Sequence, residues 1–197
     1  MGMKIVLTLL ALFLVVLAAG IVGMNFRFSA NPVTSMNTFS LTSPVFKDGE
    51  MIPAKYTCDG ERFLSPPLSI AHAPEGTQSF ALLVEDPDIP QTFKDERGID
   101  AFDHWVLYAI PANTTEIPEG GAVGAQGLNS ANTSGYTGPC PPPEYEPTTH
   151  RYLFKLYALS GTLNFIKEPT ASEVKGAIES MIIGEALLTG TYDRSGN

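Results

Sequence analysis

The sequence predicts a mainly β fold with one helix in its C-terminal half. Four segments are rich in β-branched or aromatic residues and are bounded by Gly, Pro, Asn or Asp, as β-strands commonly are. These segments are residues 78–85, 104–110, 151–159 and 186–192. The 16 prolines of the chain lie mostly between them, where they stiffen the connections. We therefore expect a core built from β-sheet.

The predicted strands differ in how their apolar residues are arranged. In residues 78–85, Phe80, Leu82 and Val84 alternate along the chain, which is typical of a strand with one buried face. Residues 104–110 are almost continuously apolar. Because such a run suits a strand that is covered on both faces, we expect residues 104–110 to form a central strand.

One helix is predicted to begin after Thr170. Thr170 and Glu173, three residues later, match the capping-box pattern in which each side chain bonds the backbone N–H of the other. The apolar residues that follow at helical spacing are Val174, Ala177, Ile178, Met181 and Ile182. We expect this apolar face to pack on the sheet.

The N-terminus carries an apolar stretch that does not belong to this core. Residues 5–24 contain no charged side chain, and a helix over this range would be about 30 Å long, the hydrocarbon thickness of a bilayer. We predict a helical membrane anchor in residues 1–27, a polar tether in residues 28–38 and a domain in residues 39–197 that lies outside the cytoplasm. The alternative is a signal peptide cleaved after residues 16–19, which would leave a secreted domain.

Cys58 and Cys140 are the only cysteines. An even pair in an exported domain is compatible with one disulfide. Two buried free thiols are the other interpretation, and the sequence does not decide between them.

The net charge of −9 restricts the classes of partner. Nucleic acids are held by clustered Lys and Arg, which this chain does not have, so a nucleic-acid partner is excluded. Any recognition of phosphate must therefore come from a local pocket with hydrogen-bond donors rather than from the charge of the whole surface.

Polar residues stand at the ends of three predicted strands. Asp86 and Asp88 follow the first strand and are held by neighbouring prolines, whereas His104 and His150 begin or precede two later strands. An Asp-Pro turn alone would indicate only a structural role. Three polar strand ends beside the Gly- and Pro-rich loop at residues 135–142 predict a shared pocket, in which an imidazole can donate a hydrogen bond to an oxyanion.

The motifs of the chain, in their order, resemble the phosphatidylethanolamine-binding protein family, also called Raf kinase inhibitor-like proteins, in its bacterial and archaeal branch. The likeness extends from about Phe39 to Arg194. The motifs are Asp86-Pro87-Asp88-x-Pro90, Asp103-His104-Trp105, Gly135-Tyr136-Thr137-Gly138-Pro139-Cys140-Pro141-Pro142 and His150-Arg151-Tyr152. The resemblance implies a β-sandwich fold.

The resemblance also implies a ligand site. In the family, the equivalents of five residues line a small cavity that holds phosphate, phosphoethanolamine, acetate or similar anions. These residues are Asp86, His104, Gly138, His150 and Tyr152. We expect Asp86 to orient a histidine and Gly138 to let main-chain N–H groups approach the anion. Arg151 has the opposite strand parity, so we expect it to form a salt bridge instead of a ligand contact.

We therefore predict a protein that binds a small anion or a phospholipid head group without catalysis and without a cofactor. The alternative is a protease inhibitor, or less readily a kinase inhibitor, that acts through loops near the pocket such as residues 91–100. A metal site at His104, His150, Asp86 and Asp88 lacks any typical ligand spacing, so we predict no metal. A Cys140–His150 nucleophile pair is disfavoured because no third group is seen to orient the base.

Overall fold

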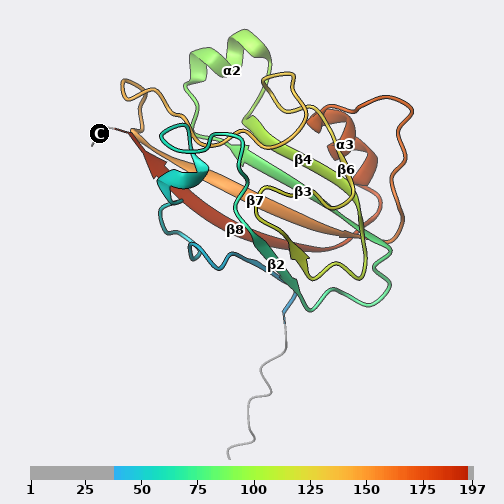
Figure 1. Cartoon of the computed structure of the whole chain (residues 1–197). Coiled ribbons are helices and arrows are strands. Elements are labelled where there is room, and N and C mark those ends of the chain that lie inside the picture. The colour runs from blue at the N-terminus through green and yellow to red at the C-terminus, as the bar shows by residue number, and fades with distance from the viewer. Residues whose placement is uncertain (1–37, 195–197) are drawn as a thin grey trace, which may run out of the picture. The chain divides into compact units, whose positions relative to one another are not determined.

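The computed structural model describes residues 38–194 of the chain. In these residues two antiparallel sheets form the framework (Figure 1). A five-stranded sheet has the order β6-β4-β3-β7-β8, and a three-stranded sheet has the order β1-β2-β5. The strands are β1 Ser40–Thr42, β2 Leu68–Ala71, β3 Ser79–Asp86, β4 Phe102–Pro111, β5 Glu116–Ile117, β6 Ala125–Gln126, β7 Thr149–Leu159 and β8 Ile182–Asp193.

The mainly β prediction is confirmed, and the four predicted strands correspond to β3, β4, β7 and β8. The expectation that residues 78–85 bury one face only is wrong, because β3 is buried along its whole length. Phe80 and Leu82 belong to the apolar core on one side of the sheet, whereas Ala81 and Leu83 belong to the core on the other side. The reason is tertiary: each face of β3 is covered by a different part of the chain.

The first of these two cores lies between the sheets. Leu68, Ile70 and Ile117 of the three-stranded sheet belong to the same buried cluster as Phe154 and Leu156 of β7. Apolar side chains from the two sheets therefore form one packed interior, as in a β-sandwich.

The second core lies under the helix α3, Ala171–Ile178. The predicted capping box is present: the Thr170 hydroxyl accepts a hydrogen bond from the Glu173 N–H, and the Glu173 carboxylate accepts one from the Thr170 N–H. Val174 and Ile178 are buried against the sheet. The predicted apolar stripe is longer than the helix, because Ile182 already belongs to β8.

A second α-helix, α2, spans Gln91–Arg97, where the sequence predicted a loop. No residue of α2 is buried, so the segment has no apolar stripe that could have indicated a helix. The signals present were Pro90 at its start and Gly98, with φ 64°, at its end. A short 3-10 helix, η1, covers Ala54–Tyr56.

Cys58 and Cys140 form a disulfide, with their Cα atoms 5.4 Å apart. The bond joins the two long irregular segments that precede β2 and β7. Next to it, the Cys58 N–H donates a hydrogen bond to the Pro139 carbonyl. The disulfide therefore fixes the loop at residues 135–142 against the loop at residues 54–62.

The predicted membrane-anchored location is corrected. Among residues 38–194, no helix is long and apolar enough to cross a bilayer. The predicted anchor and tether, residues 1–27 and 28–38, fall outside the described residues apart from Thr38. The prediction of a domain held at a membrane by one N-terminal span is therefore withdrawn.

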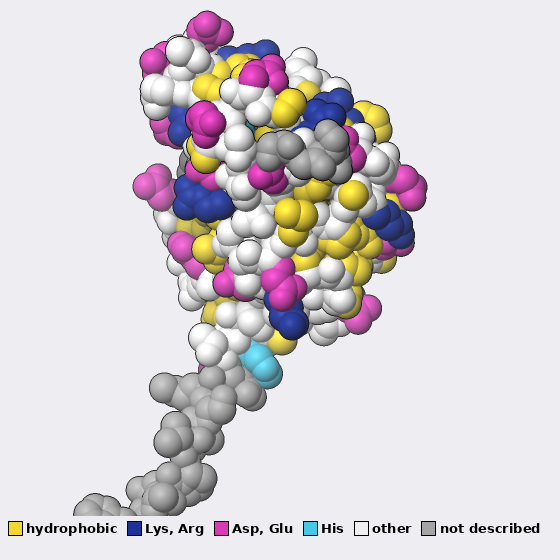
Figure 2. Space-filling view, turned by 90° about the vertical axis from the view of Figure 1, so that its left-hand side faces the viewer, with side chains coloured by type: hydrophobic (Ala, Val, Ile, Leu, Met, Phe, Trp, Pro, Cys, Tyr) yellow, Lys and Arg dark blue, Asp and Glu magenta, His cyan; other side chains and the backbone are white. Residues whose placement is uncertain are grey.

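The surface carries charges of both signs. On the face drawn in Figure 2, Asp and Glu side chains lie among Lys and Arg, and no continuous basic area is visible there. This distribution gives that face no electrostatic attraction for a phosphate backbone.

We predict that replacing both cysteines by Ser lowers the free energy of unfolding by about 4 kcal/mol, because the disulfide closes a long loop and restricts the unfolded chain. The sequence separation of the two cysteines is 82. Urea unfolding of both proteins measures the change. Reductant should destabilise the wild type by a similar amount and leave the double variant unchanged; equal unfolding midpoints for the two proteins would contradict the prediction.

Candidate functional site

A pocket of about 190 Å³ opens where β3 ends and where β4 and β7 begin. The antiparallel register places Asp86, the last residue of β3, opposite Phe102 of β4, and places Glu85 opposite Leu153 of β7. Polar residues that are far apart in sequence therefore meet at one end of the sheet. All five predicted site residues line this pocket: Asp86, His104, Gly138, His150 and Tyr152.

Asp86 orients His150, the role that was expected of its carboxylate. His150 Nδ1 lies 2.7 Å from Asp86 Oδ2, and both side chains are buried. Because a carboxylate oxygen accepts, Nδ1 is the donor of this hydrogen bond. The other carboxylate oxygen accepts from the Asp88 N–H, at 2.8 Å. Both Asp86 oxygens are thus occupied, and the ring of His150 is held in one orientation.

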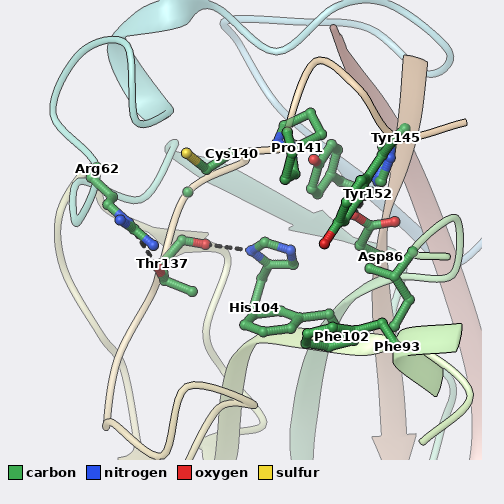
Figure 3. A pocket seen from close by; sticks show the side chains of 14 residues that line it. Arg62, Asp86, Phe93, Phe102, His104, Thr137, Cys140, Pro141, Tyr145 and Tyr152 are labelled. Atoms are coloured by element: carbon green, nitrogen blue, oxygen red, sulfur yellow. Dashed lines mark hydrogen bonds and ion pairs between the residues drawn. The ribbon is translucent and has the colours of Figure 1, made fainter. Parts of the chain in front are cut away.

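His104 is held from the opposite side of the pocket. Its Nδ1 donates to the main-chain carbonyl of Thr137, at 2.7 Å. Burial lowers the pKa of His104, so the neutral ring is favoured. In Figure 3 the far side of this ring faces Tyr152, and the two ring centroids lie 5.1 Å apart.

Two buried polar atoms of β7 have no hydrogen-bond partner within the described part of the chain. They are Nε2 of His150 and the hydroxyl of Tyr152. Burial raises the pKa of Tyr152, and the negative charge of Asp86 raises it further, so the phenol keeps its proton. Because buried polar groups are nearly always paired, these two atoms indicate a place for a ligand or for water.

Gly138 has a role different from the predicted one. Its N–H donates to the Arg62 carbonyl, at 2.7 Å, so it is not available to an anion. A Cβ at this position would lie 2.4 Å from the Tyr56 carbonyl oxygen. The glycine is therefore required where two loops pack closely, and main-chain donation from Gly138 to a ligand is not supported.

Arg62 lies at the rim of the pocket and was not predicted. Its guanidinium Nε contacts the Thr137 hydroxyl at 3.5 Å, and its charge lies 5.9 Å from the centre of the Phe63 ring. Within residues 38–194, most of its five N–H donors are thus not engaged by other groups. No local pattern indicates Arg62, because the disulfide and the packing of two loops bring this segment to the site.

Apolar side chains form the remaining wall of the pocket. They come from the turn before α2, from α2 itself, from the start of β4 and from the loop after Cys140. They are Ile89, Phe93, Phe102, Pro141, Pro142 and Tyr145. The pocket therefore combines a polar end with an apolar entrance.

Two neighbours of the pocket residues are structural. Arg151 forms an ion pair with Asp88, at 2.7 Å, as its strand parity predicted, and this pair lowers the pKa of Asp88. Trp105 is buried in the core between the sheets.

The rival chemistries find no support at this site. Among residues 38–194, no group of three His, Cys, Asp or Glu side chains is arranged to hold a metal ion. Cys140 is bonded to Cys58, so it offers no thiolate near His150.

Most of the chain is similar in sequence to known proteins. The family model for phosphatidylethanolamine-binding protein matches residues 42–193. A UPF0098 protein of Chlamydia pneumoniae is 42% identical over 156 residues, which cover 79% of this chain and 99% of that protein. A UPF0098 protein of Methanothermobacter thermautotrophicus is 38% identical over 162 residues, with the same coverage of 79% and 99%.

Two solved structures are similar in fold and in sequence. CT736 of Chlamydia trachomatis, a phosphatidylethanolamine-binding protein homologue, gives a TM-score of 0.72 at 38% identity and covers 80% of this chain and 99% of its own. YbcL of E. coli, a new member of the mammalian PEBP family, gives 0.69 at 29% identity and covers 79% and 98%. These matches confirm the resemblance first seen in the motifs. The chain belongs to the phosphatidylethanolamine-binding protein family.

Proposed function

We propose that the domain binds a small oxyanion, such as phosphate, phosphoethanolamine or a carboxylate, without catalysing its conversion. The observation that carries the proposal is the pair of unpartnered polar atoms in the pocket, Nε2 of His150 and the hydroxyl of Tyr152. Leaving such a group buried and unpaired costs about 1–3 kcal/mol. A ligand oxygen that accepts from the Tyr152 hydroxyl and from a protonated Nε2 of His150 would remove this cost.

The charges around the pocket favour an anion. The Arg62 guanidinium supplies a positive charge and free donors at the rim. The Tyr152 phenol supplies a neutral donor. His150 becomes a further donor when its Nε2 takes up a proton, and the resulting cation would be paired with the Asp86 carboxylate that it already contacts.

The size and wall of the pocket favour a head group over a whole lipid. A volume of about 190 Å³ lies below the roughly 300–1,000 Å³ of pockets for drug-sized ligands. The aromatic and proline side chains at the entrance would contact the carbon atoms that follow the anionic group. The names of the relatives refer to phosphatidylethanolamine binding, which agrees with this choice.

Two observations support the proposal of binding without catalysis. The only thiol candidates are joined in the disulfide, and both oxygens of Asp86 already accept hydrogen bonds. The alternative of protease inhibition is not supported by any contact in the pocket or by the relatives, so we do not propose it.

We predict that the His104→Ala, His150→Ala double variant loses binding of inorganic phosphate. The full chain, labelled with ¹⁵N, is titrated with phosphate and the amide shifts are followed by NMR. Wild-type protein should show saturable shifts at residues around the pocket, because both imidazoles border the ligand. The double variant should show none at millimolar phosphate while keeping its dispersed spectrum.

The matched control is His72→Asn. His72 is exposed on the surface and is the third of the 3 histidines. Its φ of 57° is one that Asn adopts readily. This variant should bind as the wild type does. Unchanged phosphate binding in the double variant would refute the anion site.

We also predict that Arg62→Ala weakens phosphate binding roughly tenfold, because one charge-assisted hydrogen bond is lost. Isothermal titration calorimetry measures the affinity. The control is Lys167→Ala, which removes an equal charge from an exposed side chain paired with Glu173 on the surface. Equal losses in the two variants would mean that Arg62 acts only through overall charge.

A further inference from the structure

We propose that His104 accepts a hydrogen bond from the ligand and thereby selects oxyanions that carry a proton of their own, such as hydrogen phosphate, over fully deprotonated ones such as sulfate. This inference rests on the proposed anion-binding function and adds the class of anion. The geometry that leads to it is the hydrogen bond between His104 Nδ1 and the Thr137 carbonyl.

That hydrogen bond decides which ring nitrogen of His104 carries the proton. A carbonyl oxygen can only accept, so Nδ1 must donate. In the neutral ring the proton is then absent from Nε2, which presents a lone pair. Nε2 makes no hydrogen bond to any residue in the range 38–194, and His104 lines the pocket. A ligand atom that meets this nitrogen must therefore bring a hydrogen atom.

The neutral form of His104 is favoured by its surroundings. The side chain is buried and lies against the rings of Phe102 and Tyr152. Among its charged and titratable neighbours, Asp86 favours the cation, while Arg62 and His150 disfavour it. Burial outweighs both the hydrogen bond to the Thr137 carbonyl and the attraction of Asp86, so the pKa of His104 is lowered. The other ionisable groups around the pocket are Tyr145, Tyr152, Tyr136, Asp88 and Arg151, and the last two neutralise each other in an ion pair.

His150 differs from His104 in its partner. Its Nδ1 donates to a carboxylate, so a second proton on Nε2 forms an ion pair with Asp86. His104 has only a neutral carbonyl as its partner. The same residue type thus provides a donor at one side of the pocket when protonated and an acceptor at the other. An oxyanion with both a bare oxygen and an O–H group matches this pair, as a protonated phosphate does.

Sulfate fits the pocket less well for the same reason. It has the tetrahedral shape of phosphate but carries no proton near neutral pH, so one of its oxygens would face the lone pair of His104 Nε2. The resulting repulsion and the unpaired acceptor cost affinity, roughly tenfold or more. A phosphate monoester should bind as phosphate does while it keeps its second proton. It should bind weakly, as sulfate does, after it loses that proton at a pKa of about 6.

The test compares three probes, inorganic phosphate, methyl phosphate and sulfate, by isothermal titration calorimetry with the full chain at about pH 5 and about pH 8. Across this range inorganic phosphate keeps at least one proton, methyl phosphate loses its last proton near pH 6, and sulfate has none. The dissociation constants of methyl phosphate and phosphate are compared as a ratio at each pH. Protonation of the protein affects both constants equally, because both ligands enter the same pocket with the same net charge, so it does not change the ratio.

We expect this ratio to be near one at the lower pH and to rise roughly tenfold at the higher pH. Sulfate should bind more weakly than phosphate at both. A ratio that stays constant, or sulfate binding as tight as phosphate binding, would overturn the selection by His104 and leave the anion site intact. Binding of none of the three probes would instead refute the proposed function itself, and the inference with it.

A substitution tests whether His104 is the residue that causes the preference for protonated oxyanions. In His104→Gln the side-chain amide offers an N–H donor as well as an acceptor, so the preference for phosphate over sulfate should shrink severalfold. His150→Gln is the matched variant and should weaken both anions while keeping the preference. An unchanged preference in folded His104→Gln would contradict the proposal; if this variant does not fold, the wild-type series with three probes still decides.

Discussion

The antiparallel pairing of β3 with β4 and β7 is the constraint on which the rest of the structure depends. β3 is buried on both faces, so its register cannot slip without moving apolar side chains into solvent or into the wrong core. This pairing fixes the last residue of β3, Asp86, beside the beginnings of β4 and β7. The site is therefore a consequence of strand register, and its geometry is as rigid as the two cores that hold β3 in place.

The pocket places polar atoms at the edge of this buried framework, where they reduce stability unless they are paired. Asp86 holds one nitrogen of His150 and Thr137 holds one nitrogen of His104. Nε2 of His150 and the hydroxyl of Tyr152 nevertheless have no partner among the residues that the structure describes. Such unmet groups are characteristic of sites that bind. The apolar interior between the sheets and the Cys58–Cys140 disulfide offset their cost, the latter directly beside the pocket.

Two histidines of the same pocket acquire different chemistry from their partners. The Asp86 carboxylate holds Nδ1 of His150, whereas the Thr137 carbonyl holds Nδ1 of His104 and burial keeps the His104 ring neutral. Arg62 adds a charge at the rim, and the aromatic side chains from α2 and β4 close the other side. The geometry of the pocket therefore depends on backbone carbonyls and loop packing as much as on the side chains that line it.

The sequence by itself determined four of the strands and the capped helix, because strand propensity and the Thr170–Glu173 cap are local signals. Its ordered motifs, through the family resemblance, also indicated the five residues that meet in the pocket. It also determined the salt bridge of Arg151 through strand parity. Only the tertiary structure decided that both faces of β3 are buried and that α2 forms without an apolar stripe. It also decided that Gly138 is needed for the packing of two loops and that Arg62 lies at the rim of the pocket. These features depend on contacts between segments far apart in the chain, and no local pattern specifies which segments will meet.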